Sequence, residues 1–387
     1  MKQKIDTKKG GKNIWLLGSS SMFNDVGSEM ITPILPFYIS TLGGGGVAIG
    51  LISGLREGLS SLFKILGGWL SDRTGKRRNF IFLGYLISVI SRFLLVMAGS
   101  WQQITTLLSI ERFGKLRDAP RDAIISVSTK KRGRGFGFHQ MMDTSGGVIG
   151  TLIVLLLFWK LNFEFVRIIF IAAAISILSL IPLFFVKEPK MKKSKKNLFE
   201  GFKKMNRKLK YFIFVSSVFT LANFGMYMFL ILRAKEITGS VAFALGLYIL
   251  FSLAYAVFAV PFGSLSDRVG RKKVLLVGYT LFLIVSLAFT NSINIFSLSL
   301  LFILYGVVYA IVTSTQRAFV SDLSGNMKGT ALGFYHGIIG LVNIPAGLIA
   351  GILWDIHYSI MFWYVSVVAL ISIIFLLFVK EENEFRR

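Results

Sequence analysis

The sequence predicts an all-α membrane protein in which twelve transmembrane helices form two pseudo-symmetric six-helix bundles. Three observations support this prediction: the composition, a series of long apolar windows and an internal repeat. Hydrophobic residues make up 54% of the 387 positions and charged residues only 16%, against about 25% in soluble domains. A soluble fold of this length cannot bury so much apolar surface. The apolar runs are continuous and do not alternate with polar residues, which excludes a β-barrel.

Windows of about 18 to 25 mostly apolar residues cross a bilayer as helices. The most polar of the twelve windows, 101–126, is expected to be a polar-lined span because apolar windows lie on both sides of it. The first window follows a basic segment without a small-residue cleavage site, so we expect it to be retained and not removed as a signal peptide. The predicted spans are 14–39, 47–70, 80–99, 101–126, 136–158, 167–186, 211–232, 241–262, 274–290, 295–321, 330–353 and 359–379.

The basic residues are distributed very unevenly between the two sides of this topology. The chain has 44 Lys and Arg against 19 Asp and Glu, a net charge of +25, which in a soluble protein points to nucleic acid. Here 32 of the 44 fall in segments on one side, four on the other and eight within spans. This asymmetry predicts a cell-membrane protein with both termini in the cytoplasm, and no nucleic-acid partner.

The only long polar segment divides the chain into two halves of six spans each. We expect an N-terminal bundle at 1–186, a basic cytoplasmic linker at 187–210 and a C-terminal bundle at 211–387. The lysines of the linker favour a solvated segment that fixes orientation over a site for anionic lipid, which would gain about 1 kcal/mol per basic residue. The chain has no cysteine, so disulfides, thiolate metal sites and thiol redox chemistry are excluded.

The two halves repeat each other at a nearly constant offset. GWLSDRTGKRR begins at Gly68 and GSLSDRVGRKK at Gly263, an offset of 195, and the pairs Gly137/Gly333 and Arg121/Arg317 follow at 196. Each motif stands at the same point of its six-span half. Paired repeats of this kind are typical of transporters with a substrate site between the halves.

The repeated motif, G-x-L-S-D-R-x-G followed by three basic residues, resembles the signature loop of the major facilitator superfamily. The likeness covers the whole chain, including the spans, both loops and the basic linker, and implies the major facilitator fold. Within the superfamily, GKLRDAPRDAIISVS and the following RGRGFGFHQMMDTSGG resemble a prokaryotic subgroup of drug- or quinolone-resistance-like permeases. This second resemblance says little about the substrate.

The signature loops are expected to work as gates. A carboxylate at the end of a span can face the positive end of a neighbouring helix or pair with an arginine, and glycines permit the tight turn. The resemblance implies that Asp72 and Asp267 act as latches of the outward-facing state. A simpler alternative is a turn that carries orientation charges. The residues assigned to these loops are Gly68, Asp72, Arg73, Gly75, Gly263, Asp267, Arg268 and Gly270.

Charged residues inside the spans crowd into the N-terminal half, where we expect the coupling chemistry. A charge at the centre of a span costs about 2.5 to 3.5 kcal/mol, which makes each a functional candidate. Asp25 and Glu29 are four residues apart and share one helix face. Two adjacent carboxylates in a low dielectric are not both ionised cheaply, which suggests a proton carrier or a site for a cationic substrate. The alternative is pairing with Arg56, Lys64 or Arg92.

The other coupling candidates are Arg112, Arg92, His139 and Asp143. Arg112 resembles the family's intramembrane arginine, although a glycine follows it more closely than usual, and Arg92 is its rival. His139 and Asp143, again four apart, form either a proton relay or a plain interhelical hydrogen bond. The same span lacks the Gly-Pro pair of proton-coupled drug antiporters, so its glycines are explained by close helix packing alone.

A gate network is expected near the cytoplasmic end of the fourth span. Arg117 and Arg121 would pair there with Asp72, and Arg317 is the counterpart of Arg121 in the second half. We favour this network over a substrate site. A metal site from Asp25, Glu29, His139 and His336 is chemically possible, but no spacing requires one, and we expect none.

These observations predict a secondary active transporter that works by alternating access and exports a small amphipathic or cationic solute in exchange for protons. A metal-ion or metabolite carrier and a non-transporting membrane sensor are the alternatives. Enzymatic activity is not expected, because the sequence has no P-loop, HExxH or GxSxG motif. The expected partners are a small-molecule substrate, protons and the lipid bilayer. We expect a monomer without a cofactor.

Overall fold

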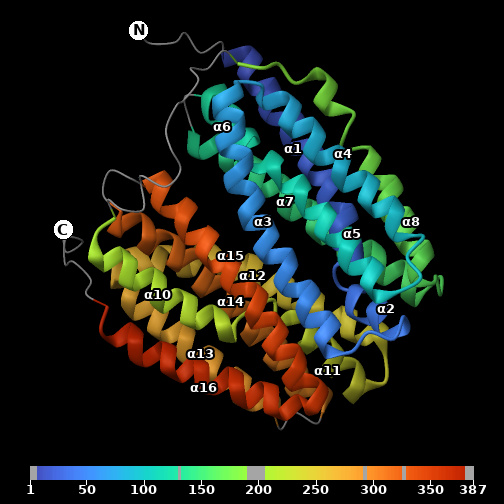
Figure 1. Ribbon diagram of the computed structural model, residues 1–387, viewed down its shortest axis with the longest axis vertical. Coiled ribbons are helices and arrows are strands. Elements are labelled where there is room, and N and C mark those ends of the chain that lie inside the picture. Colours follow the sequence, from blue (N-terminus) through green and yellow to red (C-terminus); the bar gives the residue numbers. More distant parts are fainter. Residues whose placement is uncertain (1–6, 130–131, 190–204, 291–293, 325–327, 380–387) are drawn as a thin grey trace. The chain divides into compact units, whose positions relative to one another are not determined.

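The computed structural model describes residues 7–129, 132–189, 205–290, 294–324 and 328–379. Every regular element in these ranges is a helix (Figure 1), which confirms the all-α class. Nine helices of the described part are long and apolar enough to cross a membrane. The other three predicted spans, 14–39, 47–70 and 101–126, are also largely helical, and they hold most of the charges found inside spans.

The first predicted span is broken where its prolines stand. Helix α1 covers Thr7–Ile31 and α2 covers Leu35–Thr41, with Pro33 in the turn between them and Pro36 in the first turn of α2. Thr32 closes the last turn of α1, because its hydroxyl donates to the Ser28 carbonyl at 2.9 Å. The helix breaks at these prolines because proline lacks the amide that a continuous helix needs.

A second break, which the sequence analysis did not predict, divides the span 211–232. Helix α10 covers Arg207–Ala222 and α11 covers Tyr227–Thr238. Gly225 lies between them, and a Cβ there would come within 2.1 Å of the Ser53 hydroxyl. Only glycine allows so close an approach, so the break depends on a tertiary contact as well as on local helix propensity.

The polar fourth span is a helix interrupted by one tighter turn. Helix α5 covers Trp101–Phe113, the 3-10 turn η1 covers Gly114–Arg117 and α6 covers Asp118–Ser128. At η1 the chain lies backbone to backbone against α4, Arg77–Leu95. A Cβ on Gly114 would come within 2.5 Å of the Gly84 carbonyl. The contact holds the charged residues of this span against α4.

The remaining helices lie on the predicted apolar windows, and several extend beyond them at one or both ends. The window 167–186 holds a shorter helix, Phe165–Ile177, followed by a 3-10 turn at Pro182–Phe185. Several helices begin at polar caps. Asn294, for example, accepts a hydrogen bond from the Ser297 amide at 2.8 Å, which satisfies a free amide at the helix start. These elements are α3 Gly46–Thr74, α7 Arg132–Trp159, α8 Phe165–Ile177, η2 Pro182–Phe185, α12 Val241–Val269, α13 Arg271–Thr290, α14 Ile295–Leu323, α15 Lys328–Ile356 and α16 Tyr358–Leu377.

The chain divides into two units: unit 1 is 1–43 with 59–196, and unit 2 is 44–58 with 197–387. The predicted bundle boundaries remain a prediction, and residues 190–204 of the basic linker lie outside the described residues. In unit 1, α1 packs against α7 and α8, and α4 packs against α5 and α8 (Figure 1). Helix α6 also packs against α1, so α1 lies beside three helices of unit 1.

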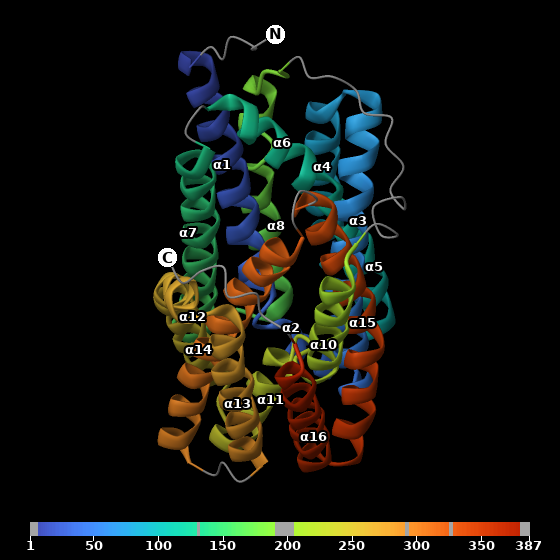
Figure 2. The same cartoon turned by 90° about the vertical axis from the view of Figure 1, so that its left-hand side faces the viewer.

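Unit 2 is built from α10 to α16 together with the first part of α3. Helix α12 packs against α14, and α13 lies between α14 and α16 (Figure 2). The start of α3 joins this unit through α15. The Asp355 carboxylate accepts hydrogen bonds from the Gly46 and Val47 amides at 2.5 and 2.9 Å, and Gly50 lies against Gly347 so closely that a Cβ would come within 2.0 Å of its carbonyl.

Candidate functional site

The site begins with the close contact between α1 and α7. A Cβ on Gly146 would come within 2.5 Å of the Met22 carbonyl, and one on Gly150 within 2.3 Å of the Val26 carbonyl. The glycines of the fifth predicted span therefore let two helix backbones touch, as small residues do in membrane proteins. This packing brings the polar residues of α1 beside those of α7.

Asp25 of α1 and Asp143 of α7 lie close enough to interact electrostatically. The Asn24 amide donates to the Asp25 carboxylate at 3.2 Å. On α7, Nδ1 of the buried His139 lies 3.3 Å from Oδ2 of Asp143, so the structure brings together the pair predicted from its four-residue spacing. Glu29 also faces α7, because a Cβ on Gly147 would lie 3.6 Å from its Cγ.

Positive charges face this carboxylate pair from the neighbouring helices. Lys115, Arg117 and Arg121, from η1 and α6, all act electrostatically on Asp25. Arg121 also donates to the Ser21 hydroxyl at 3.2 Å and acts electrostatically on Asp143. The carboxylates and the cations thus form one polar cluster inside unit 1, in which a change of charge at one carboxylate is felt by the others.

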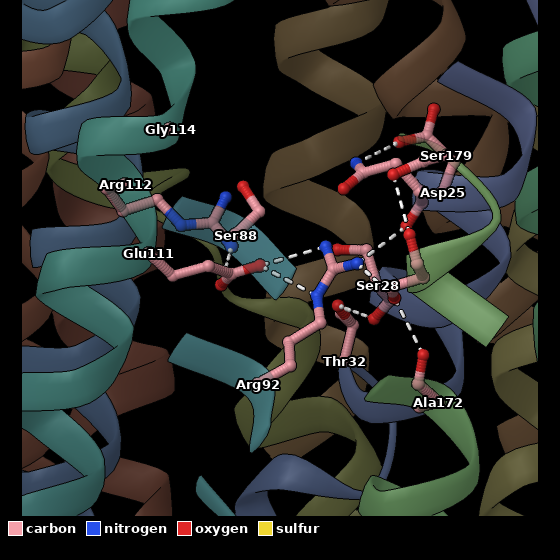
Figure 3. A network of polar contacts seen from close by, with 12 residues as sticks. Asp25, Ser28, Thr32, Ser88, Arg92, Glu111, Arg112, Gly114, Ala172 and Ser179 are labelled. Atoms are coloured by element: carbon pink, nitrogen blue, oxygen red, sulfur yellow. Dashed lines mark hydrogen bonds and ion pairs between the residues drawn. The ribbon is translucent and has the colours of Figure 1, made fainter. Parts of the chain in front are cut away.

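A second network surrounds Arg92, which is only 1% exposed (Figure 3). Its guanidinium donates to one Glu111 oxygen from Nε at 3.1 Å and from Nη2 at 2.9 Å. Nη1 donates to the Asn24 carbonyl at 3.0 Å and to the Ser176 hydroxyl at 2.6 Å. Arg92 therefore ties α4 to α5, α1 and α8, and it holds the backbone next to Asp25.

Glu111 also pairs with Arg112, whose Nη2 lies 2.7 Å from its other oxygen. The two predicted rivals, Arg92 and Arg112, thus share one carboxylate. Glu111 is not among the residues predicted for the site, although it is the one acidic residue beside Arg112 in a strongly basic span. Of the alternative partners weighed for Asp25 and Glu29, Arg92 pairs with Glu111, and Lys64 lies 3.5 Å from Asp118.

Asp118, a second residue that the sequence analysis left out, is the centre of the predicted gate network. Its carboxylate lies 3.5 to 3.8 Å from four cationic side chains. Arg117 also donates to the Ser88 hydroxyl at 2.8 Å. The structure brings Arg117 and Arg121 together as expected, but the carboxylate that they share is that of Asp118. Asp72, the expected partner, pairs with Arg77 instead. The four cations are Lys64, Lys115, Arg117 and Arg121.

The two signature loops adopt matching turns. Gly75 and Gly270 have φ of +76° and +108°, a region that favours glycine. This agrees with the expectation that the glycines of these loops permit a tight turn. Asp267 pairs with Arg271, which also lies 2.9 Å from Asp322. Both acidic residues of the loops thus pair with a basic residue at the start of the next helix. Their role as latches remains a prediction.

The other predicted loop and gate residues lie near these turns or on exposed faces. The Arg73 guanidinium is 5.4 Å from the centre of the Trp69 ring, and a Cβ on Gly68 would lie 3.1 Å from that of Ala119. A Cβ on Gly263 would have more room, with its nearest neighbour at 3.9 Å. Arg268 and Arg317 are exposed.

Among the described residues, no group of three or more His, Asp and Glu side chains is arranged to hold a metal ion. Asp25, Glu29 and His139 lie in unit 1, whereas His336 lies in unit 2. The polar clusters of unit 1 are mixtures of carboxylates and cationic side chains.

The contact between α1 and α7 supplies a prediction with a control on the same helix. Gly150→Ala is expected to lower the free energy of unfolding by about 1 to 3 kcal/mol, because its Cβ would collide with the α1 backbone. Gly137→Ala, with nothing within 4 Å, is expected to leave stability unchanged or to raise it by up to about 1 kcal/mol. Thermal denaturation of both variants in detergent is the measurement, and equal stabilities would contradict the packing argument.

Comparisons with known proteins agree with this architecture. A sequence model of the Major Facilitator Superfamily matches residues 17–249 and 213–386. An uncharacterised MFS-type transporter of Methanocaldococcus jannaschii is 47% identical over 378 residues, 95% of each chain. The multidrug resistance protein MdtH of Proteus mirabilis is 26% identical over 336 residues, 84% of this chain and 82% of MdtH. The nucleoside transporter NupG matches with a TM-score of 0.82 and 15% identity, covering 95% of this chain and all of NupG.

Proposed function

This chain belongs to the Major Facilitator Superfamily and is therefore a multi-pass membrane transporter and not an enzyme, and we propose that it exports a small amphipathic or cationic solute in exchange for protons. The observation that carries the proposal is the pair of carboxylates, Asp25 and Asp143, held together by the contact of α1 with α7. The multidrug resistance name of the distant relative MdtH agrees with export. The proposed location is the cell membrane, with both termini in the cytoplasm, and the proposed form is a monomer.

The carboxylate pair provides the chemistry that proton exchange needs. Two carboxylates close together in a low dielectric are cheaper to keep with one of them protonated than with both charged. His139 offers a second proton acceptor beside Asp143, and Lys115, Arg117 and Arg121 set the surrounding potential. Loss of the proton adds one negative charge to the cluster, which favours the binding of a cationic solute, so binding of the proton and binding of the solute oppose each other.

The same competition links the proton to alternating access. Asp25 stands beside Asn24, whose backbone carbonyl is held by Arg92, and Arg121 connects α6 to α1 through Ser21. A change of charge at Asp25 therefore alters the interactions that α1 makes with α4 and α6. A transporter with two conformations responds to such a change by shifting its population between them.

A ligand screen at two pH values, one on each side of neutrality, tests the proposal. The purified protein is heated in detergent with lipophilic cations, nucleosides and divalent metal salts in turn. We expect a lipophilic cation to raise the melting temperature, and to do so more strongly at the higher pH, because the carboxylate pair is then free of its proton. Stabilisation by divalent metals alone would contradict the proposal and favour a metal-ion carrier.

A further inference from the structure

Unit 2 contains a continuous row of aromatic rings that the proton chemistry of unit 1 does not use. Tyr248 of α12 contacts Tyr227 of α11, with ring centres 5.9 Å apart, and Phe251, 5.7 Å away. Phe251 stacks on Tyr305 of α14 at 5.2 Å and meets Tyr309 edge-on at 5.7 Å. The row thus joins three helices through aromatic side chains, all of which except Phe251 also carry a hydroxyl.

The row ends in Tyr255, whose ring meets Tyr309 edge-on at 5.2 Å with an angle of 84° between the planes. Its inner members are buried: Tyr305 is 1% exposed, and its hydroxyl donates to Asn223 at 3.0 Å. Tyr227, Tyr255 and Tyr309, in contrast, are only half-buried. The inner rings form a rigid base, and the three outer tyrosines present ring surface that the protein does not cover.

A carboxylate accompanies these exposed rings. Glu57, in the part of α3 that belongs to unit 2, is exposed and acts electrostatically on Tyr309, as do Tyr227 and Tyr255. A charge in the middle of a membrane helix is costly and marks a functional position unless it is paired away. Arg317 also acts on Tyr309, more weakly than Glu57, and its charge disfavours a ligand with two positive charges.

Aromatic faces beside a carboxylate are the combination that attracts organic cations. The ring quadrupoles attract a cation within about 6 Å of the ring centre, most strongly where water is excluded, and the carboxylate adds direct attraction. We propose that Glu57 and the outer tyrosines Tyr227, Tyr255 and Tyr309 form the site in unit 2 that binds the cationic head and apolar body of a monovalent organic cation. This inference rests on the proposed function, because it names the substrate class of the same transporter.

Equilibrium binding of tetraphenylphosphonium to the purified full-length protein tests the site without requiring transport. Titration calorimetry is expected to show binding that weakens about tenfold in Glu57→Gln and in Tyr309→Leu, since each loses one attractive component. Tyr309→Phe keeps the ring and is expected to bind within about twofold of the unmodified protein. Tetraphenylborate, which has the same shape and the opposite charge, is expected not to bind.

Matched controls separate the site from general effects of substitution. Glu236→Gln removes another exposed carboxylate of unit 2, which pairs with Arg233 at 3.0 Å, and Tyr364→Leu removes another half-buried tyrosine, on α16. Both are expected to bind like the unmodified protein. Unchanged binding in Glu57→Gln and Tyr309→Leu, or equal binding of both tetraphenyl ions, would overturn the proposal. Melting temperatures of all variants show that each is folded.

Tetraphenylphosphonium binding by Asp25→Asn shows whether a negative result disproves the cation site in unit 2 or the proton exchange proposed for unit 1. If this variant binds tetraphenylphosphonium normally while Glu57→Gln does not, the cation site stands whatever the coupling ion is. If Asp25→Asn loses binding and the variants at Glu57 and Tyr309 keep it, the cation site in unit 2 is wrong, and the carboxylates of unit 1 alone recognise the solute.

Discussion

Replacing Arg92 by methionine is expected to lower the free energy of unfolding by about 3 to 5 kcal/mol, the usual cost of breaking a buried ion pair from one side. Arg92 is 1% exposed and donates to Glu111, Asn24 and Ser176. Methionine fills much of the same volume but leaves these acceptors with one partner fewer in a low dielectric. The expected result is a large drop in melting temperature, measured by thermal denaturation in detergent.

Two controls make this prediction specific. Arg268→Met removes an exposed arginine and is expected to change stability by no more than about 0.5 kcal/mol. Arg92→Lys keeps the charge but not the forked geometry that reaches Glu111 and Asn24 together. We therefore expect its stability to lie between those of Arg92→Met and Arg268→Met. An Arg92→Met variant as stable as Arg268→Met would show that the network does not hold α4, α5, α1 and α8 together.

Replacing Asp25 by asparagine is expected to abolish transport driven by a pH gradient and to leave the protein folded. Asparagine has nearly the shape of the carboxyl group and keeps a hydrogen-bonding partner for Asn24, but it carries no exchangeable proton. Asp143→Asn is expected to act in the same direction, because the two carboxylates interact. Exchange of solute across the membrane without a gradient needs no net proton movement, so we expect it to continue in both variants.

Most of the fold was predictable because most of its determinants are local in sequence. Apolar windows predicted the helices, and Gly75 and Gly270, the glycines expected to permit the turns of the repeated loops, have positive φ. The break between α10 and α11 was missed because it depends on Gly225 meeting Ser53, a residue 172 positions away. Local helix propensity does not predict a contact between residues so far apart in sequence.

The candidate site was predictable where its members stand one helical turn apart. His139 and Asp143 meet as their spacing predicted. Glu111 and Asp118 also pair with neighbours in sequence, but the contacts that link them to other helices could not be predicted: Arg92 lies 19 residues from Glu111, and Lys64 reaches Asp118 from α3. Which carboxylate an arginine reaches depends on how the helices cross, and glycines such as Gly84 and Gly114 set that crossing by letting backbones touch.

The most direct test of the account is the flux of tetraphenylphosphonium in proteoliposomes, measured with and without a pH gradient, for the unmodified protein and for Asp25→Asn. The account predicts that a gradient accelerates flux in the unmodified protein, that it has no effect in Asp25→Asn, and that Glu236→Gln behaves like the unmodified protein. Acceleration of equal size in Asp25→Asn would contradict the central claim, because the proton would then move through the protein without this carboxylate.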